Sequence, residues 1–368
     1  MVRKKRLIVF PSWISTPHYE TDLEIAINHA QRGWDVYVAH CRGELNSCMT
    51  NREQDPLVCL TCSSRISQGL AIARKVAILK TLRIRNLTVA ALPNLPSWSS
   101  AEELRQFMYG EYEVGRAVFS TISFILGEHT FDIDEYQPLV KREIRTACSV
   151  IEWLESDILQ LEPHRMVILN GRFTVQGMTV GFCKKFGIEY LTHERAGVLG
   201  SYKLRINTVI HDIDADKADI EKVWSESGRD EEEKKRIGAS FFTERVKGLS
   251  QGWHSFKTLQ KDRLLPVDFD QTKRNIAIFP SSWEEHVTFP QWYGNPIYED
   301  DQKALEEILE DRRLQDCVFW IRLHPNLVQR GRKQVKITAT LGNTYPNARI
   351  IDPQSPQWGL RAFFGESR

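Results

Sequence analysis

The clearest fold signal in this sequence is LIVFPSWISTPHYETDLEIAINHAQRGWDVYVA, residues 7–39. Leu7–Phe10 and Asp35–Ala39 are short runs rich in residues that favour β-strands. Between them, Tyr19–Ala30 places apolar side chains near one helical face, and Gly33 ends the helix. Strand, helix and strand in this order form a βαβ unit with parallel strands. The stretch therefore predicts the start of a Rossmann-like α/β domain.

The alternation of strands and helices continues along the chain. Further candidate strands are Asn86–Ala91, Met166–Leu169 and Glu189–Leu191, with helical stretches between them at 100–127, 135–161 and 173–186. The segment from Ala215 to about Gly248 is dominated by Asp, Glu, Lys and Arg, a composition typical of solvated helical faces.

A second α/β pattern occupies the C-terminal part. Its candidate strands and helices are Asn275–Pro280, 300–311, Cys317–Arg322, 330–342 and Ala348–Asp352. We therefore predict an α/β protein of two Rossmann-like domains facing a cleft, residues 1–265 and 266–368. Only sixteen residues follow Asp352, so we expect the second domain to be incomplete.

Composition and missing motifs disfavour several functions. The 368 residues carry 49 Lys+Arg and 48 Asp+Glu, so we expect no nucleic-acid partner. The N-terminal apolar run is too short for a secretion signal, and no stretch reaches the ~20 residues of a membrane span. This predicts a cytoplasmic protein, with peripheral contact at the inner membrane face left open. The lack of GxGxxG, GxxxxGK[ST], HExxH and GxSxG motifs disfavours dinucleotide oxidoreductases, P-loop NTPases, zincins and α/β-hydrolases.

Polar side chains follow the strands of the predicted second domain. Arg322, His324 and Asn326 come at the carboxyl end of a strand, where open α/β sheets bind ligands. Ser281 and Ser282 follow another strand and can present hydroxyl and N–H groups to a phosphate. Glu285, in the next turn, is a candidate for acid/base work or for binding a ribose hydroxyl. The plainer alternative is that these residues cap strands and helices.

The predicted first domain repeats this pattern at three strand ends. We expect the following residues at its cleft: Tyr19, Glu20, Asp22, Asn170, Gly171, Arg172, Glu194 and Arg195. Gly171 permits a tight turn, and Arg172 is expected to reach into the cleft. Three of these residues, Glu20, Asp22 and Glu194, carry carboxylates, and any of them can deprotonate a hydroxyl nucleophile. For each one taken alone, a helix cap or an ion-pair partner is the plainer interpretation.

Four of the seven cysteines cluster after the second strand. Cys41, Cys48, Cys59 and Cys62 follow a C-x6-C-x10-C-x2-C spacing. Four thiolates can hold a tetrahedral zinc ion that ties down a long loop. The alternative is a set of reduced cysteines in a packed loop, because the first gap is wider than most structural zinc sites use.

A series of short motifs runs along most of the chain: Tyr19-Glu-x-Asp-Leu-Glu-Ile-Ala with His29, Cys41-Arg-Gly-x-Leu-x-x-Cys48, Cys59-x-x-Cys62, Asn170-Gly-Arg172, His193-Glu-Arg195, Phe279-Pro-Ser-Ser282 and Arg322-Leu-His-Pro-Asn326. In this order and spacing the motifs resemble the capsular polysaccharide biosynthesis glycosyltransferases of bacteria. The resemblance implies a GT-B fold. In that fold a nucleotide-sugar donor binds mainly the second domain, a saccharide or lipid-linked saccharide acceptor binds mainly the first, and transfer needs no metal.

The resemblance also implies roles for individual residues. Arg322, His324 and Asn326 resemble a His-Pro motif that contacts the donor phosphate. His324 is expected to act in catalysis, because with Arg322 it would stabilise the charge of the departing nucleotide. Glu194 or Glu20 is the expected base if the reaction inverts. A Ser/Thr-Gly turn found in relatives after a segment like Pro353–Pro356 is missing. Two alternatives therefore stay open. One is a truncated, non-catalytic relative that acts as a partner, and the other is a nucleotide-sugar epimerase of the same fold.

Overall fold

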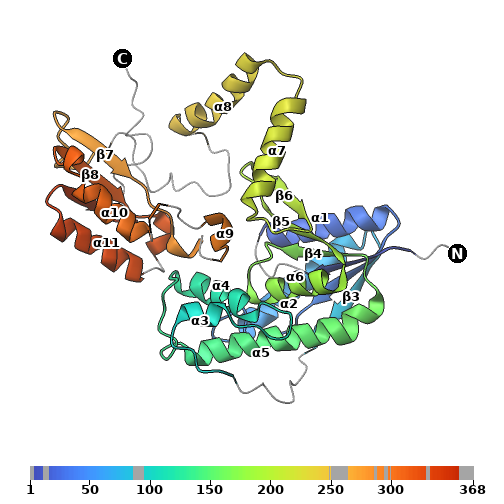
Figure 1. Cartoon of the computed structure of the whole chain (residues 1–368). Coiled ribbons are helices and arrows are strands. Elements are labelled where there is room, and N and C mark those ends of the chain that lie inside the picture. The colour runs from blue at the N-terminus through green and yellow to red at the C-terminus, as the bar shows by residue number, and fades with distance from the viewer. Residues whose placement is uncertain are drawn as a thin grey trace. The chain divides into compact units, whose positions relative to one another are not determined.

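A computed structural model describes residues 4–10, 16–85, 95–247, 249, 264–285, 288–293, 297–298, 300–328 and 332–355 (Figure 1). The chain divides into two compact units. Unit 1 comprises Met1–Ile125, His129–Ala196 and Ser201–Asp212, and unit 2 comprises Leu126–Glu128, Gly197–Gly200 and Ile213–Arg368. The domain boundary at 265/266 stays a prediction.

Unit 1 is built on a six-stranded sheet. Its strands are β1 (Arg6–Phe10), β2 (Asp35–His40), β3 (Leu79–Arg83), β4 (Arg165–Leu169), β5 (Glu189–Arg195) and β6 (Tyr202–Ile206). They lie in the order β3-β2-β1-β4-β5-β6, and all neighbours are parallel except β5 and β6. This is the strand order of a Rossmann fold with its last strand reversed. The Rossmann-like α/β prediction for this part of the chain is confirmed.

The helices of unit 1 follow the predicted pattern with local differences. They are α1 (His18–Gln31), α2 (Pro56–Ala73), α3 (Ala101–Arg105), α4 (Val114–Leu126), α5 (Gln137–Trp153) and α6 (Thr174–Phe186). The predicted helix over 100–127 is interrupted and forms α3 and α4. The predicted strand Asn86–Ala91 lies outside the described residues. A core joins α1 and α2 to one sheet face and includes Val9, Ile25 and Leu70.

Three elements of unit 1 differ from the sequence prediction. Helix α2 occupies the segment expected to be a long loop, because Asp55 caps its first turn and Ile66 and Leu70 bury one side. Strand β3 forms along a largely exposed segment that has no alternating apolar pattern. Strand β6 pairs with the edge of the sheet in the antiparallel direction, which a parallel α/β pattern does not signal.

Unit 2 contains a smaller, wholly parallel sheet of β7 (Arg274–Ile278), β8 (Cys317–Arg322) and β9 (Ala348–Ile351) in that order. Its helices are α7 (Ile213–Glu226), α8 (Glu231–Val246), α9 (Pro290–Tyr293), α10 (Asp301–Glu310) and α11 (Arg332–Thr344). Leu309, Phe319 and Leu341 lie in the core between this sheet and its helices.

The charge-rich segment forms α7 and α8. Helix α7 has no buried residue, which confirms that it presents solvated faces. Across the part of the chain that the structure describes, no helix has both the length and the apolar character required to cross a membrane.

Candidate functional site

The site of unit 1 lies where the order of its strands reverses. Helix α1 follows β1, the turn Asn170–Phe173 follows β4, and β5 is the next strand outward. In open α/β sheets the carboxyl ends of strands at such a reversal are where ligands bind. Side chains from β5, from the β4–α6 turn and from the start of α1 meet there.

Glu194 is the central carboxylate of this cluster. Asn170 Nδ2 donates a hydrogen bond to Glu194 Oε2 at 3.0 Å, and the N–H of Arg195 donates to Glu194 Oε1 at 3.1 Å. His18 Nε2 lies 3.4 Å from the same Oε1. The Glu194 side chain keeps 26% of its surface exposed, so a solute can reach it. The structure thus brings together Glu194, Asn170 and Arg195, all predicted for this site, and adds His18.

His18 sits in an environment that disfavours its charged form. Burial lowers the pKa of His18, the Glu194 carboxylate opposes that shift, and His193 and Arg195 add to it. A neutral imidazole beside a carboxylate can donate a hydrogen bond to it or relay a proton.

The β4–α6 turn depends on two residues in left-handed backbone conformations. Asn170 has φ +59° and Gly171 has φ +91°. A Cβ on Gly171 would lie 2.9 Å from Val209 Cγ1, so the position has no room for a side chain. Asn is one of the few non-glycine residues that adopts φ near +60° readily, and here this conformation coincides with its hydrogen bond to Glu194. The tight turn predicted at Gly171 is confirmed.

A second pair lies beneath the cluster. His193 Nε2 is 2.7 Å from Asp22 Oδ1, and both side chains are fully buried. Because a carboxylate only accepts, the pairing places a proton on Nε2. Within the described part of the chain, Nδ1 of His193 has no hydrogen-bond partner.

Four residues predicted at the cleft lie elsewhere. Tyr19 is in the core, where its hydroxyl donates to the Ile66 carbonyl at 2.6 Å, and Asp22 is buried against His193. Arg172 is 7% exposed and lies over the Phe173 ring. Glu20 pairs with Arg65 at the surface. The first three are corrections: the register of α1 turns Tyr19 and Asp22 inward, and aromatic rings retain the Arg172 guanidinium.

In unit 2, the end of β8 presents a buried guanidinium and an oriented imidazole. Arg322 is 4% exposed and donates to the Ser355 carbonyl at 3.2 Å; burial lowers the pKa of this guanidinium, and Asp352 opposes the shift. His324 Nδ1 accepts the N–H of Asn326 at 3.2 Å. Nδ1 is therefore the unprotonated nitrogen, and Nε2 of the neutral ring carries the proton.

The loop after β7 is held by a residue that the sequence did not single out. Gln334 of α11 donates from Nε2 to the Ser281 carbonyl at 2.9 Å and accepts the N–H of Trp283 at 3.2 Å. Ser282 is fully buried, and its hydroxyl has no hydrogen-bond partner among the described residues. The Glu285 side chain lies outside the described residues.

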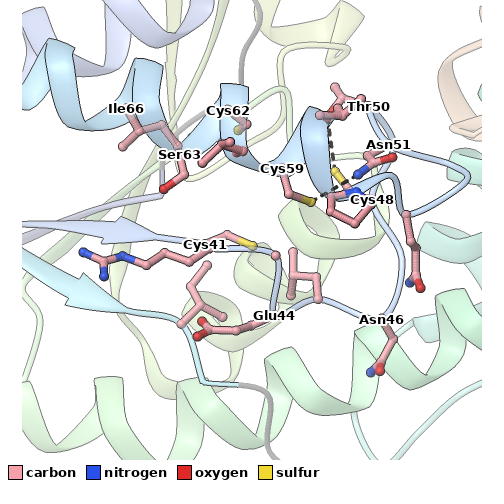
Figure 2. Close-up of a pocket in the computed structure, with 18 of the residues that line it drawn as sticks. Cys41, Glu44, Asn46, Cys48, Thr50, Asn51, Cys59, Cys62, Ser63 and Ile66 are labelled. Atoms are coloured by element: carbon pink, nitrogen blue, oxygen red, sulfur yellow. Dashed lines mark hydrogen bonds between the residues drawn. The ribbon is translucent and has the colours of Figure 1, made fainter.

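The four clustered cysteines line one cavity of about 570 Å³ in unit 1 (Figure 2). Cys41 and Cys48 come from the β2–α2 loop, and Cys59 and Cys62 from α2. Cys59 Sγ accepts a hydrogen bond from Asn51 at 3.1 Å. Burial, and to a smaller extent the other three thiols, raise the pKa of the Cys62 thiol to about 12.

The structure gives the zinc prediction no support. In the described segments, no three His, Cys, Asp or Glu side chains are grouped so that they could hold a metal ion. All seven cysteines are free thiols. A structural zinc site on Cys41, Cys48, Cys59 and Cys62 stays a prediction.

Sequence reasoning missed three polar residues that the fold brings to important positions. His193 stands inside a quoted motif and His18 directly precedes another, but only the packing of α1 on β5 shows their partners. Glu143 of α5 is buried and accepts hydrogen bonds from Ser47 at 2.5 Å and Thr174 at 2.6 Å. The sequence did hold one signal for Glu143, because it is a lone Glu on an apolar helix face.

Comparison with known proteins identifies no family. No protein-family model matches the chain, and no curated protein matches it. Among solved structures, the chain is similar to a crystallised glycosyltransferase of kitacinnamycin, at 10% sequence identity and a TM-score of 0.26. The match covers 95% of this chain and 71% of the glycosyltransferase chain. A TM-score this low supports no conclusion about this chain's fold or activity.

Proposed function

We propose that the protein is a glycosyltransferase that moves a sugar from a nucleotide-sugar donor to a saccharide or lipid-linked saccharide acceptor. The observation that carries the proposal is the partly exposed Glu194 carboxylate, held by Asn170 and beside His18 at the strand-order reversal. The growing capsular or other surface polysaccharide, made at the inner face of the membrane, is the acceptor that the motif resemblance suggests.

Glu194 has the environment that a general base needs. In an inverting reaction the acceptor hydroxyl oxygen attacks the anomeric carbon of the donor. The bond between that carbon and the leaving phosphate oxygen then breaks. Glu194 takes the hydroxyl proton, and the nucleotide leaves with the electron pair. The hydrogen bond from Asn170 directs one carboxylate oxygen, and a neutral His18 can donate to the other.

The end of β8 has the chemistry that a departing nucleotide phosphate needs. The Nε2–H of a neutral His324 and the Arg322 guanidinium are donors, and developing negative charge is stabilised by donors that are already oriented. The unpartnered Ser282 hydroxyl, on the loop held by Gln334, is a further candidate donor.

Thermal-shift screening against CMP-, UDP-, GDP- and dTDP-sugars tests the donor half of the proposal. One nucleotide class is expected to raise the melting temperature, because a ligand that binds only the folded state stabilises it. His324→Ala should abolish this shift, and His164→Ala, which changes an exposed histidine hydrogen-bonded to the Arg6 N–H, should retain it. Transfer is then assayed with the donor so identified.

The same experiment separates the two alternatives. Absence of a shift with every nucleotide contradicts donor binding and favours a non-catalytic partner. Conversion of the donor sugar to an isomer without any acceptor favours a nucleotide-sugar epimerase.

A further inference from the structure

Two residues of β5 contact two residues that are one turn apart on α1. His193 pairs with Asp22, and the next residue, Glu194, lies beside His18. Positions i and i+4 share one helix face, so both contacts come from the same side of α1. The inner pair is fully buried, whereas the outer pair keeps 14% and 26% of its side-chain surface exposed.

This arrangement gives the two pairs different capacities. The outer pair can meet a solute, but an exposed histidine–carboxylate contact is weak by itself because water competes for both groups. The inner pair is sealed from water, and its 2.7 Å hydrogen bond connects α1 to a strand 171 residues away in sequence. A buried hydrogen bond is costly to lose, because both partners would then remain unsatisfied.

We propose that Asp22 is a positioning residue: through His193 it holds the start of α1 on β5 and so keeps His18 beside the Glu194 carboxylate. The inference rests on the proposed function, in which Glu194 takes the acceptor proton. Neither Asp22 nor His193 contacts substrate, because both are fully buried.

The protonation of His18 reports this positioning without any assay of activity. The titratable and charged groups that face His18 are Glu194, Arg195 and His193 from β5, and Asp22 from its own helix. Burial is the largest cause of its lowered pKa. If the start of α1 leaves β5, His18 gains water, and its pKa moves back toward the ordinary value.

The test is a pH titration of the full chain labelled with ¹³C at the histidine Cε1 and observed by NMR. The His18 signal is assigned by its loss in His18→Gln. Asp22→Ala is expected to give a higher His18 midpoint than wild type, because the water that reaches His18 outweighs the loss of the Asp22 charge, which by itself lowers that midpoint. Asp22→Asn should keep the midpoint low, because its amide oxygen can still accept the Nε2–H of His193. Tyr202→Phe, which removes a 3.3 Å hydrogen bond from β6 to Glu24 of α1, is the matched control and should also keep it low.

Three results overturn the proposal: an unchanged midpoint in Asp22→Ala, an equal rise in Asp22→Asn, or an equal rise in Tyr202→Phe. The first shows that the inner pair does not position His18. The second shows that a hydrogen-bond acceptor at position 22 is not what holds α1 on β5, since loss of the charge alone would lower the midpoint. The third shows that any loosening of α1 suffices. If Asp22→Ala does not fold, Asp22→Leu, which also removes the acceptor but is closer to Asp in size, takes its place.

Transfer measurements distinguish this inference from the proposed function. Where transfer is observed, Asp22→Ala should lower turnover without changing the KM for donor. A wild-type chain that shows no transfer contradicts the proposed function, and the NMR outcome still decides the positioning role.

Discussion

Glu194 is the residue on which the proposed chemistry depends. Glu194→Gln keeps the hydrogen bond from Asn170 but cannot take a proton, so we expect turnover to fall by about 10²–10⁴-fold. Glu24→Gln, the same change at an exposed position of α1, should leave turnover unchanged. Initial rates with the donor found by thermal shift measure both variants. Equal turnover in wild type and Glu194→Gln would exclude Glu194 as the base.

Glu143 provides a second test at the residue scale. Burial raises the pKa of Glu143, so the folded protein binds this proton more tightly than the unfolded chain does. Wild type therefore loses free energy of unfolding as the pH rises from the ordinary Glu value through the raised one. Glu143→Gln does not titrate, and its amide can still bond both hydroxyls.

We therefore expect the free energy of unfolding of Glu143→Gln to match that of wild type near pH 4.5 and to exceed it at pH 8. Urea unfolding at the two pH values measures the difference, and other titrating groups cancel between the two proteins. A difference that does not depend on pH would show that Glu143 keeps an ordinary pKa.

At the scale of elements, the β4–α6 turn places Asn170 beside Glu194. Gly171→Ala combines φ +91° with a Cβ 2.9 Å from Val209, so we expect it to destabilise the protein by about 1–3 kcal/mol. Gly187→Ala is the matched control. Gly187 also has a positive φ but has open space where a Cβ would lie. Gly187→Ala should therefore destabilise the protein by about 1 kcal/mol, the lower end of that range. Equal losses in chemical denaturation would mean that the contact with Val209 adds nothing.

At the scale of the whole molecule, the division into two units predicts that residues 1–212 fold without the rest. All six strands of the larger sheet and the core over α1 and α2 lie in this range. The fragment should give a cooperative thermal transition and a near-UV circular dichroism signal from its buried aromatic side chains, such as Trp153. A fragment that shows secondary structure but no cooperative transition would mean that unit 1 requires the remainder of the chain.

Much of the fold was predictable because the signals are local. The βαβ unit at 7–39 follows from apolar spacing and from Gly33, and it is the β1–α1–β2 unit of the structure. Because parallel strands end at one edge of a sheet, polar residues after two neighbouring strands were expected together, and Asn170 meets Glu194 as expected. The exposed strand β3 carries no such local signal.

The sequence by itself determined the α/β class, the parallel strand direction and the edge of the sheet where polar groups gather. Only the tertiary structure decided that Tyr19 and Asp22 face inward, that Arg172 lies over Phe173, and that His18 stands beside Glu194. The physical reason is the range of the interactions. Periodicity and turn residues act over a few positions, whereas these contacts depend on how a helix rotates when it buries its apolar side on strands far away in sequence.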